Sequence, residues 1–261
     1  MERIVYLERE SIIADVRRPA CDHAWSEYAR TSQAEVEARL ADATIAIVNK
    51  LILDAETIAR LPMLKMIAVA ATGTNNVDLD ACRARGIVVS NIRGYAVHTV
   101  PEHAIALMLA LSRNLVAYRN SVQAGRWQES EQFCFFDHPI RDLHGATLAV
   151  LGSGSLGDGV VRLAEAFGMH VLKAERKGAP VCRPGYTPFA EALAAADVVS
   201  LHCPLTPETQ GLIGANELRA MKSSPLLLNT ARGGLVDEVA LVAALREGWI
   251  AGAGFDVLTK E

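Results

Sequence analysis

Hydrophobic and polar positions divide the chain into segments of two kinds. Short apolar runs, which are typical of buried strands, alternate with longer segments whose apolar residues recur every three or four positions, as in amphipathic helices. In the amino-terminal part the predicted strands are 4–7, 44–48, 66–70 and 87–90, and the predicted helices are 32–40, 54–61 and 78–84. Strands that alternate with helices in this way predict a parallel sheet with helices on its faces.

A second alternation of the same kind begins at Thr147. Its predicted strands are 147–151, 170–174, 198–202, 226–229 and 251–255, and its predicted helices are 156–167, 188–195, 215–221 and 236–247. Together the two alternations predict an α/β protein with two doubly wound parallel-sheet domains, residues 1–98 and 99–261.

The segment between the two alternations begins with a capping box, Thr99-x-x-Glu102, with Pro101 in the first turn. This pattern predicts a long helix that runs to about residue 118 and links the two domains. Residues 125–142 have little periodicity and are predicted to form a loop.

Composition narrows the class of protein. Of the 261 residues 51% are hydrophobic, and the formal net charge of -4 gives no support for binding nucleic acid or an anionic membrane. Five widely spaced cysteines without a CxxC pair indicate a reduced, cytoplasmic protein without disulfides or a metal site. The most apolar long segment, 103–119, is interrupted by Arg113 and Asn114 and is too short to span a membrane. The charged amino terminus is unlike a secretory signal.

A glycine-rich turn carries the clearest chemical signal. Residues 152–157 read GSGSLG, a G-x-G-x-x-G pattern that follows a predicted strand and opens a predicted helix. In a dinucleotide-binding turn the first glycine allows the tight bend, the second lets the pyrophosphate approach the backbone, and the third lets helix and strand pack closely. The candidate phosphate-binding residues are therefore Gly152, Gly154, Ser155, Leu156 and Gly157. A tight strand-to-helix turn without a ligand is the alternative.

An acidic residue follows at the expected distance. Glu175 ends the next strand, 23 positions after Gly152, close to the roughly 20-residue offset of the acid that holds the ribose hydroxyls. A carboxylate there repels a 2′-phosphate and favours NAD. Arg176 and Lys177 come next and leave NADP open as an alternative.

Three further stretches carry a family resemblance: 200–209 (SLHCPLTPET), 228–238 (LNTARGGLVDE) and 252–257 (GAGFDV). In order and spacing the chain resembles the D-isomer-specific 2-hydroxyacid dehydrogenases. Asn49-Lys50 and the stretches 71–77 (ATGTNNV) and 133–137 (FCFFD) are most similar to the glycerate dehydrogenase/hydroxypyruvate reductase group. The resemblance implies a flavodoxin-like substrate domain, a Rossmann NAD-binding domain and a small 2-oxo or 2-hydroxy acid as substrate. It also implies a homodimer, with the helix after Thr99 and the aromatic run 133–136 as contact regions.

The resemblance also assigns roles to individual residues. Arg232 matches the arginine that grips the 2-oxo acid, since a guanidinium binds a carboxylate in a fork and polarises a carbonyl. Asp256 matches the acid that accepts a hydrogen bond from the nicotinamide carboxamide. Further residues implied to contact the cofactor are Cys203, Pro204, Thr230, Ala231 and Arg232 itself, and those implied to bind substrate in the first domain are Lys50, Ala71, Thr72 and Gly73.

The acid–base pair of the family is only half represented. Glu261, 29 positions after Arg232, matches the glutamate that orients and charges the catalytic histidine. The family's histidine lies downstream of this glutamate. No histidine of the sequence occupies that position; the seven are His23, His98, His103, His138, His144, His170 and His202. The sequence thus reads as truncated at its carboxyl end relative to the family, without the segment that completes the first domain, and we expect it to bind cofactor but turn over slowly.

Two functions of different classes remain. The first is an oxidoreductase that transfers a hydride between NAD(H) and a small D-2-hydroxy acid/2-oxo acid pair. The expected substrates are D-glycerate/hydroxypyruvate or glyoxylate. The second is a nicotinamide-binding regulatory protein, similar to the corepressors of this superfamily, without turnover. Arg232 and Glu261 together favour the enzyme, because a sensor has no chemical need for both.

Overall fold

The computed structural model describes residues 1–260; Glu261 lies outside the described residues. The chain divides into two compact units, the first of residues Met1–Tyr95 and the second beginning at Ala96. The division falls within a few residues of the boundary that the sequence pattern places after residue 98. Each unit has its own sheet and its own buried core.

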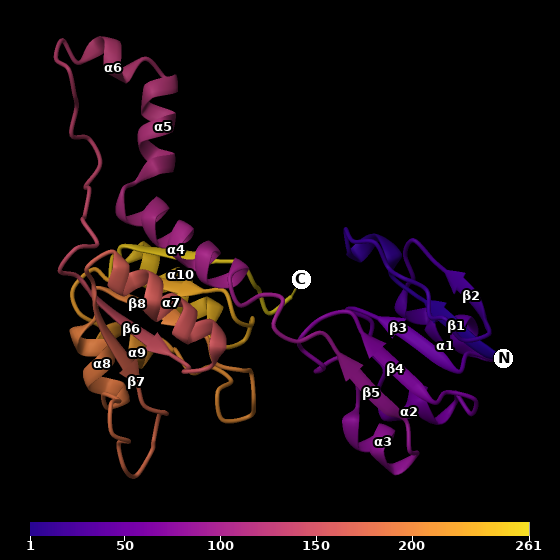
Figure 1. The fold of residues 1–261 in the computed structure, drawn as a ribbon. Helices are drawn as coiled ribbons and strands as arrows, with labels where there is room; N and C mark the ends of the chain where they lie inside the picture. Colours follow the sequence, from indigo (N-terminus) through magenta and orange to yellow (C-terminus); the bar gives the residue numbers. More distant parts are fainter. Residues whose placement is uncertain (261) are drawn as a thin grey trace. The chain divides into compact units, whose positions relative to one another are not determined.

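The first unit contains a parallel sheet in the order β2-β1-β3-β4-β5 (Figure 1). Its strands are β1 (Glu2–Tyr6), β2 (His23–Glu27), β3 (Ile45–Val48), β4 (Met66–Val69) and β5 (Val88–Asn91). Its helices are α1 (Val36–Leu40), α2 (Ala55–Ala59) and α3 (Leu79–Ala84), with 3-10 turns at Arg9–Ser11 and Gln33–Glu35. The capping box at Ser32 is confirmed, because the Ser32 backbone N–H donates to the Glu35 carboxylate at 2.8 Å, but the turn that it opens is a 3-10 turn before α1.

Strand β2 has no counterpart in the sequence prediction. Its residues, HAWSE, lack an apolar run and are largely exposed, because β2 lies at the edge of the sheet and pairs only with β1. Backbone hydrogen bonds rather than side-chain burial hold such a strand, so hydrophobic patterning cannot detect it.

One hydrophobic core holds the first unit together. Ala46 and Val48 of β3 and Ile67 of β4 are fully buried, and they pack against Leu40 of α1 and Ile58 of α2. Alternate positions of a strand point to opposite faces of the sheet, so these residues share one face. On the other face, the side chains of Ile45, Ile47, Met66 and Ala68 are only half-buried.

The second unit contains a parallel sheet in the order β10-β9-β8-β6-β7. Its strands are β6 (Thr147–Leu151), β7 (His170–Ala174), β8 (Val198–Leu201), β9 (Leu226–Asn229) and β10 (Gly252–Phe255). Its helices are α4 (Thr99–Ser112), α5 (Leu115–Gln123), α6 (Arg126–Glu129), α7 (Ser155–Ala166), α8 (Phe189–Ala195), α9 (Ala215–Ala220) and α10 (Glu238–Arg246). These strands are the ones that the apolar runs predict, with ends that differ by a residue at most.

Helices cover both faces of this sheet. On β6, Leu148 and Val150 join a core with α4 and α7, while Ala149 and Leu151 join a second core with α8, α9 and α10. Burial on both faces explains why these strands are nearly continuous hydrophobic runs. The strand that follows β6 in the chain, β7, lies on one side of β6 in the sheet, and the next strand, β8, lies on the other side. In sheets of this kind, ligands bind at the carboxyl ends of the strands where the strand order reverses.

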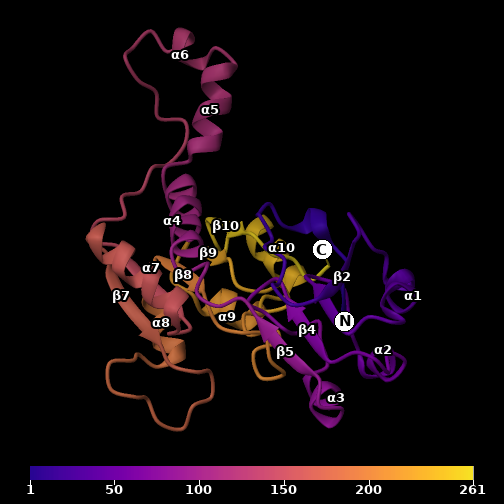
Figure 2. The ribbon, with the colours of Figure 1, turned by 45° about the vertical axis from the view of Figure 1, so that its right-hand side comes forward.

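The predicted single helix from 99 to about 118 is wrong. Helix α4 ends at Ser112, Asn114 adopts a left-handed conformation with φ of 49°, and α5 then starts in a new direction. Asparagine tolerates this conformation better than most residues, so the break falls there. Helix α4 also packs on β9 and β10 and so belongs to the second unit's core. Residues 115–142, here called the arm, extend away from the β6–β10 sheet in both views (Figures 1 and 2) and include α6 where a loop was predicted.

Candidate active site

The carboxyl ends of the strands of the second unit bring together most of the candidate residues. The glycine-rich turn follows β6, Glu175 follows β7, Cys203 and Pro204 lie just after β8, Thr230 to Arg232 follow β9, and Asp256 follows β10. All five strands are parallel, so their carboxyl ends meet at one edge of the sheet. Residues that are up to 104 positions apart in the sequence thus share one edge.

The three glycines of the turn differ in what surrounds them. Gly152 has φ of +112°, and a β-carbon there would lie 2.6 Å from the backbone nitrogen of Cys203. A β-carbon on Gly157 would lie 2.0 Å from the carbonyl oxygen of Gly152. Both positions therefore require glycine for the fold, because α7 and the end of β8 approach the turn too closely for a side chain.

Gly154 is different, because a β-carbon there would meet no atom within 4 Å. Helix α7 begins at Ser155, so the backbone N–H groups of its first turn, which include those of Ser155 and Leu156, lie beside this open space. Unpaired amides and the positive end of the helix dipole favour an anion. The turn thus fits a pyrophosphate at Gly154, the position where glycine is not needed for packing.

Two buried side-chain atoms near this edge have no hydrogen-bond partner among the described residues. They are Nδ1 of His202, after β8, and Oγ1 of Thr230, after β9. Buried polar atoms are nearly always hydrogen-bonded, so both fit a polar ligand at the edge of the sheet. The other nitrogen of His202, Nε2, lies 2.8 Å from Oγ of Ser200.

His202 is also a poor source of protons near neutral pH. Burial lowers its pKa to about 4, so the ring is uncharged at pH 7. Burial likewise raises the pKa of the neighbouring Cys203 thiol and keeps it protonated. Neither side chain is therefore suited to proton exchange with a substrate near neutral pH.

Arg232 is presented by a loop that Asn229 holds in place. The Asn229 side chain is 1% exposed; its Nδ2 donates to the Arg232 carbonyl at 2.9 Å, and its Oδ1 accepts from the Ala231 backbone N–H at 3.1 Å. The Arg232 guanidinium itself is exposed and donates to the Ala231 carbonyl at 2.7 Å. A buried amide that fixes the backbone from which an exposed guanidinium extends is an arrangement suited to a group that binds an anionic ligand.

Near the end of the described chain, the backbone returns to this loop. A β-carbon on Gly233 would lie 2.0 Å from the Leu258 carbonyl oxygen, and the Thr259 backbone N–H donates to the Glu238 carboxylate at 2.7 Å. Asp256 is exposed, and its Oδ1 lies 3.8 Å from Nε2 of His103. Glu261, the candidate partner of a catalytic histidine, lies outside the described residues.

Glu175 does not present a free carboxylate. The Arg183 guanidinium donates from Nε and Nη2 at 2.7 Å each, and the backbone N–H groups of Arg176 and Arg183 donate at 2.8 and 3.0 Å. The Arg183 guanidinium and then the Arg176 backbone lower the pKa of Glu175 to about 2, so it is ionised at any ordinary pH. A mostly apolar hollow of about 610 Å³ lies beside it, between residues 175–182 and helices α8 and α9.

The candidate substrate residues of the first unit lie after the neighbouring strands β3 and β4. Asn76 joins their loops, because its Nδ2 donates to the carbonyls of Asn49 and Leu51, on either side of Lys50. The Glu8 carboxylate accepts the backbone N–H groups of all three residues 49–51, the shortest at 2.7 Å from Asn49. The loop 71–73 is tied to the end of β5, since Asn91 donates to the Thr72 carbonyl at 2.7 Å.

Comparison with known proteins supports the same reading of the second unit. Residues 105–261 match the model of the D-isomer specific 2-hydroxyacid dehydrogenase family, NAD binding domain. The chain belongs to this family. The glycerate dehydrogenase of Methylorubrum extorquens is 49% identical over 261 residues, which cover 100% of this chain and 82% of that protein. The hydroxypyruvate reductase of Blautia hydrogenotrophica is 36% identical over 90% of this chain and 74% of its own length.

The dehydrogenase is also similar to solved structures over its whole length. The D-lactate dehydrogenase of Aquifex aeolicus, solved in complex with NAD and lactic acid, has a TM-score of 0.79 and 28% identity. The match covers 98% of this chain and 77% of that one. Both units of the dehydrogenase therefore have the fold of the family.

Four positioning residues of the dehydrogenase were not predicted from the sequence: Glu8, Asn76, Arg183 and Asn229. Each acts through contacts with residues distant in the sequence or with backbone groups, which hydrophobic patterning does not report. Asn229 alone had a signal in the sequence, since a polar residue at the end of an apolar strand inside the stretch 228–238 needs buried partners.

Among the described residues, no helix has both the length and the apolarity to cross a bilayer.

Proposed function

We propose that the protein transfers a hydride between NAD(H) and a small D-2-hydroxy acid/2-oxo acid pair, with D-glycerate/hydroxypyruvate or glyoxylate as the substrate. The observation that carries the proposal is the exposed Arg232, fixed by buried Asn229 at the same sheet edge as an open phosphate-binding turn. The names of the similar glycerate dehydrogenase and hydroxypyruvate reductase support the substrate class.

The cofactor residues divide by the part of NAD that each fits. The N–H groups of Gly154, Ser155 and Leu156 would bind the pyrophosphate, and Gly152 and Gly157 shape the turn. Glu175 would lie at the adenosine ribose. Thr230, Ala231 and Asp256 would lie along the nicotinamide half, with Cys203 and Pro204 at the end of β8 between the two groups. When bound, the cofactor supplies the hydride for the carbonyl carbon of the substrate.

The residues proposed to bind the acid substrate offer cationic side chains or backbone amides. Arg232 would hold the carboxylate in a fork and polarise the neighbouring carbonyl. In the first unit Lys50 and the loop of Ala71, Thr72 and Gly73 are proposed to contact the carboxylate. Glu261, which lies outside the described residues, is proposed to charge the proton-donating histidine of the family.

Steady-state oxidation of NADH tests this function. With hydroxypyruvate or glyoxylate we expect slow but saturable consumption of NADH, in contrast to a regulatory protein, which would bind NADH and leave both acids unchanged. Tight NADH binding without turnover of any 2-oxo acid would contradict the enzyme and favour the regulatory alternative. The relatives named above are enzymes and give that alternative no support.

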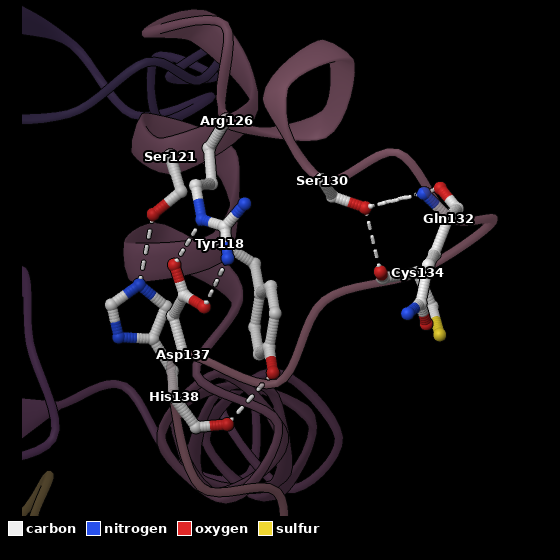
Figure 3. Close-up of polar contacts among 8 residues, drawn as sticks. All are labelled: Tyr118, Ser121, Arg126, Ser130, Gln132, Cys134, Asp137 and His138. Atoms are coloured by element: carbon white, nitrogen blue, oxygen red, sulfur yellow. Dashed lines mark hydrogen bonds and ion pairs between the residues drawn. The ribbon is translucent and has the colours of Figure 1, made fainter.

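We also propose that the dehydrogenase is a homodimer that pairs through the arm. The arm is internally ordered: Arg126 forks onto the Asp137 carboxylate at 2.6 and 3.0 Å, and the Tyr118 hydroxyl donates to the His138 carbonyl at 2.7 Å (Figure 3). Phe135 is buried in the arm's own small core, with its ring 5.2 Å from that of Tyr118. Phe133 and Phe136, by contrast, are 88% and 85% exposed. Two exposed phenylalanines on an ordered segment are typical of an interface.

The double variant Phe133→Ser/Phe136→Ser should dissociate into monomers at micromolar concentration, because the exposed rings would be the apolar centre of the contact. Val181→Ser is the matched control, since Val181 is also exposed, at 73%, but lies in the second unit outside the arm. Light scattering gives the mass of each. A wild-type monomer, or a double variant that remains dimeric, would rule out pairing through these side chains.

A further inference from the structure

The acid that should recognise the adenosine ribose is already fully occupied. A carboxylate offers about four acceptor positions, and four N–H groups fill those of Glu175: two from the Arg183 guanidinium and two from the backbone. The Glu175 side chain is 5% exposed. A ribose hydroxyl could therefore bond to Glu175 only after Arg183 moves away.

The ion pair also changes the charge at this position. A lone carboxylate repels a 2′-phosphate, and that repulsion is the usual reason for a preference for NAD. The Arg183 guanidinium cancels the Glu175 charge at a distance of 2.7 Å. Its side chain is 47% exposed, and its Nη1 has no hydrogen-bond partner among the described residues, so donors remain for an anion.

Arg183 is held next to the phosphate-binding turn by a neighbour. Its guanidinium stacks on the Tyr186 ring at 3.9 Å, and the Tyr186 hydroxyl donates to Oγ of Ser153 at 2.5 Å, between the first two glycines of the turn. The contacts bind the loop after β7 to the turn after β6, which places a cation at the ribose end of the pyrophosphate site.

The two cations next to Glu175 in the sequence are less suited to this role. Nζ of Lys177 lies 2.9 Å from the Glu217 carboxylate of α9 and also donates to the Leu212 carbonyl. Arg176 contributes its backbone N–H to Glu175. The cation that contacts the acid through its side chain is Arg183, eight positions further along the chain.

From this arrangement we infer that Arg183 sets the cofactor preference of the dehydrogenase. By holding Glu175 it withdraws the acceptor that favours NADH, and its guanidinium binds the 2′-phosphate of NADPH, so that the protein accepts both cofactors. The inference rests on the proposed dehydrogenase function, because it assumes that the adenosine ribose lies at Glu175.

Calorimetric titration with NADH and with NADPH, without substrate, tests the inference. We expect the wild type to bind the two with dissociation constants within about tenfold of each other. Arg183→Ala should weaken NADPH by about 10- to 100-fold, because it removes a charge-assisted bond and exposes the Glu175 charge, while NADH binds equally or more tightly. Glu175→Gln should shift the preference the opposite way, towards NADPH. Lys177→Ala is the matched control and should leave the ratio unchanged.

An Arg183→Ala protein that weakens both cofactors equally, or leaves their ratio unchanged, would overturn the inference; so would a wild type that binds NADH more than about 100-fold tighter than NADPH. Should Arg183→Ala fail to fold, the direction of the shift in Glu175→Gln decides alone. A wild type that binds neither cofactor would contradict the dehydrogenase function itself, and the inference with it.

Discussion

In a carboxyl-extended protein that carries the family's histidine, Arg232→Ala should lower kcat/KM for hydroxypyruvate by about 10²- to 10⁴-fold, because two charge-assisted hydrogen bonds of about 1.5–3 kcal/mol each are lost. Affinity for NADH should change little, since the guanidinium is exposed and its one described bond is to the Ala231 carbonyl. The two effects separate substrate recognition from cofactor binding. Steady-state kinetics and a binding titration on the same preparation measure both.

Arg232→Lys is the matched control for charge. A lysine keeps the positive charge but cannot form the planar fork, so we expect it to recover only part of the lost kcat/KM. Asn229 stays in place in both variants, so the loop that presents residue 232 should be unchanged. An Arg232→Ala enzyme with ordinary kcat/KM would show that the 2-oxo acid binds elsewhere.

Gly157→Ala should abolish measurable NADH binding and destabilise the protein by about 1–3 kcal/mol, the usual cost of overpacking. Its β-carbon would lie 2.0 Å from the Gly152 carbonyl oxygen, so the start of α7 must move away from the turn that it completes. Thermal unfolding and NADH titration measure the two consequences.

Gly154→Ala separates the fold from the binding site. The new methyl group would meet no atom within 4 Å, and alanine instead of glycine at the N-cap of α7 costs about 1 kcal/mol, so the melting temperature should fall by only a few degrees. NADH should nevertheless bind about tenfold more weakly or worse, because the methyl group occupies the space that the pyrophosphate needs. Unchanged NADH affinity in Gly154→Ala would contradict a phosphate site at this turn.

Much of the fold follows from local sequence. Continuous apolar runs such as 147–151 and 226–229 became strands of the second sheet because strands buried on both faces must be apolar along their whole length. The strand–turn–helix order also placed the glycine-rich turn, since a G-x-G-x-x-G sequence has a defined geometry only at the end of a strand and the start of a helix. Strand β2 was missed because an edge strand is held by its backbone.

The sequence by itself determined the family, the two parallel sheets and the strand ends on which the candidate residues lie, since these follow from hydrophobic periodicity and from short motifs with fixed local geometry. Only the tertiary structure decided that Glu175 is paired with Arg183 and not with adjacent Lys177, that Asn229 fixes the loop of Arg232, and that Asn114 turns the chain into the arm. The physical reason is that a side chain chooses among partners by position in space. A hydrogen bond or an ion pair forms only within about 3–4 Å, and distance along the chain does not report distance across a folded loop.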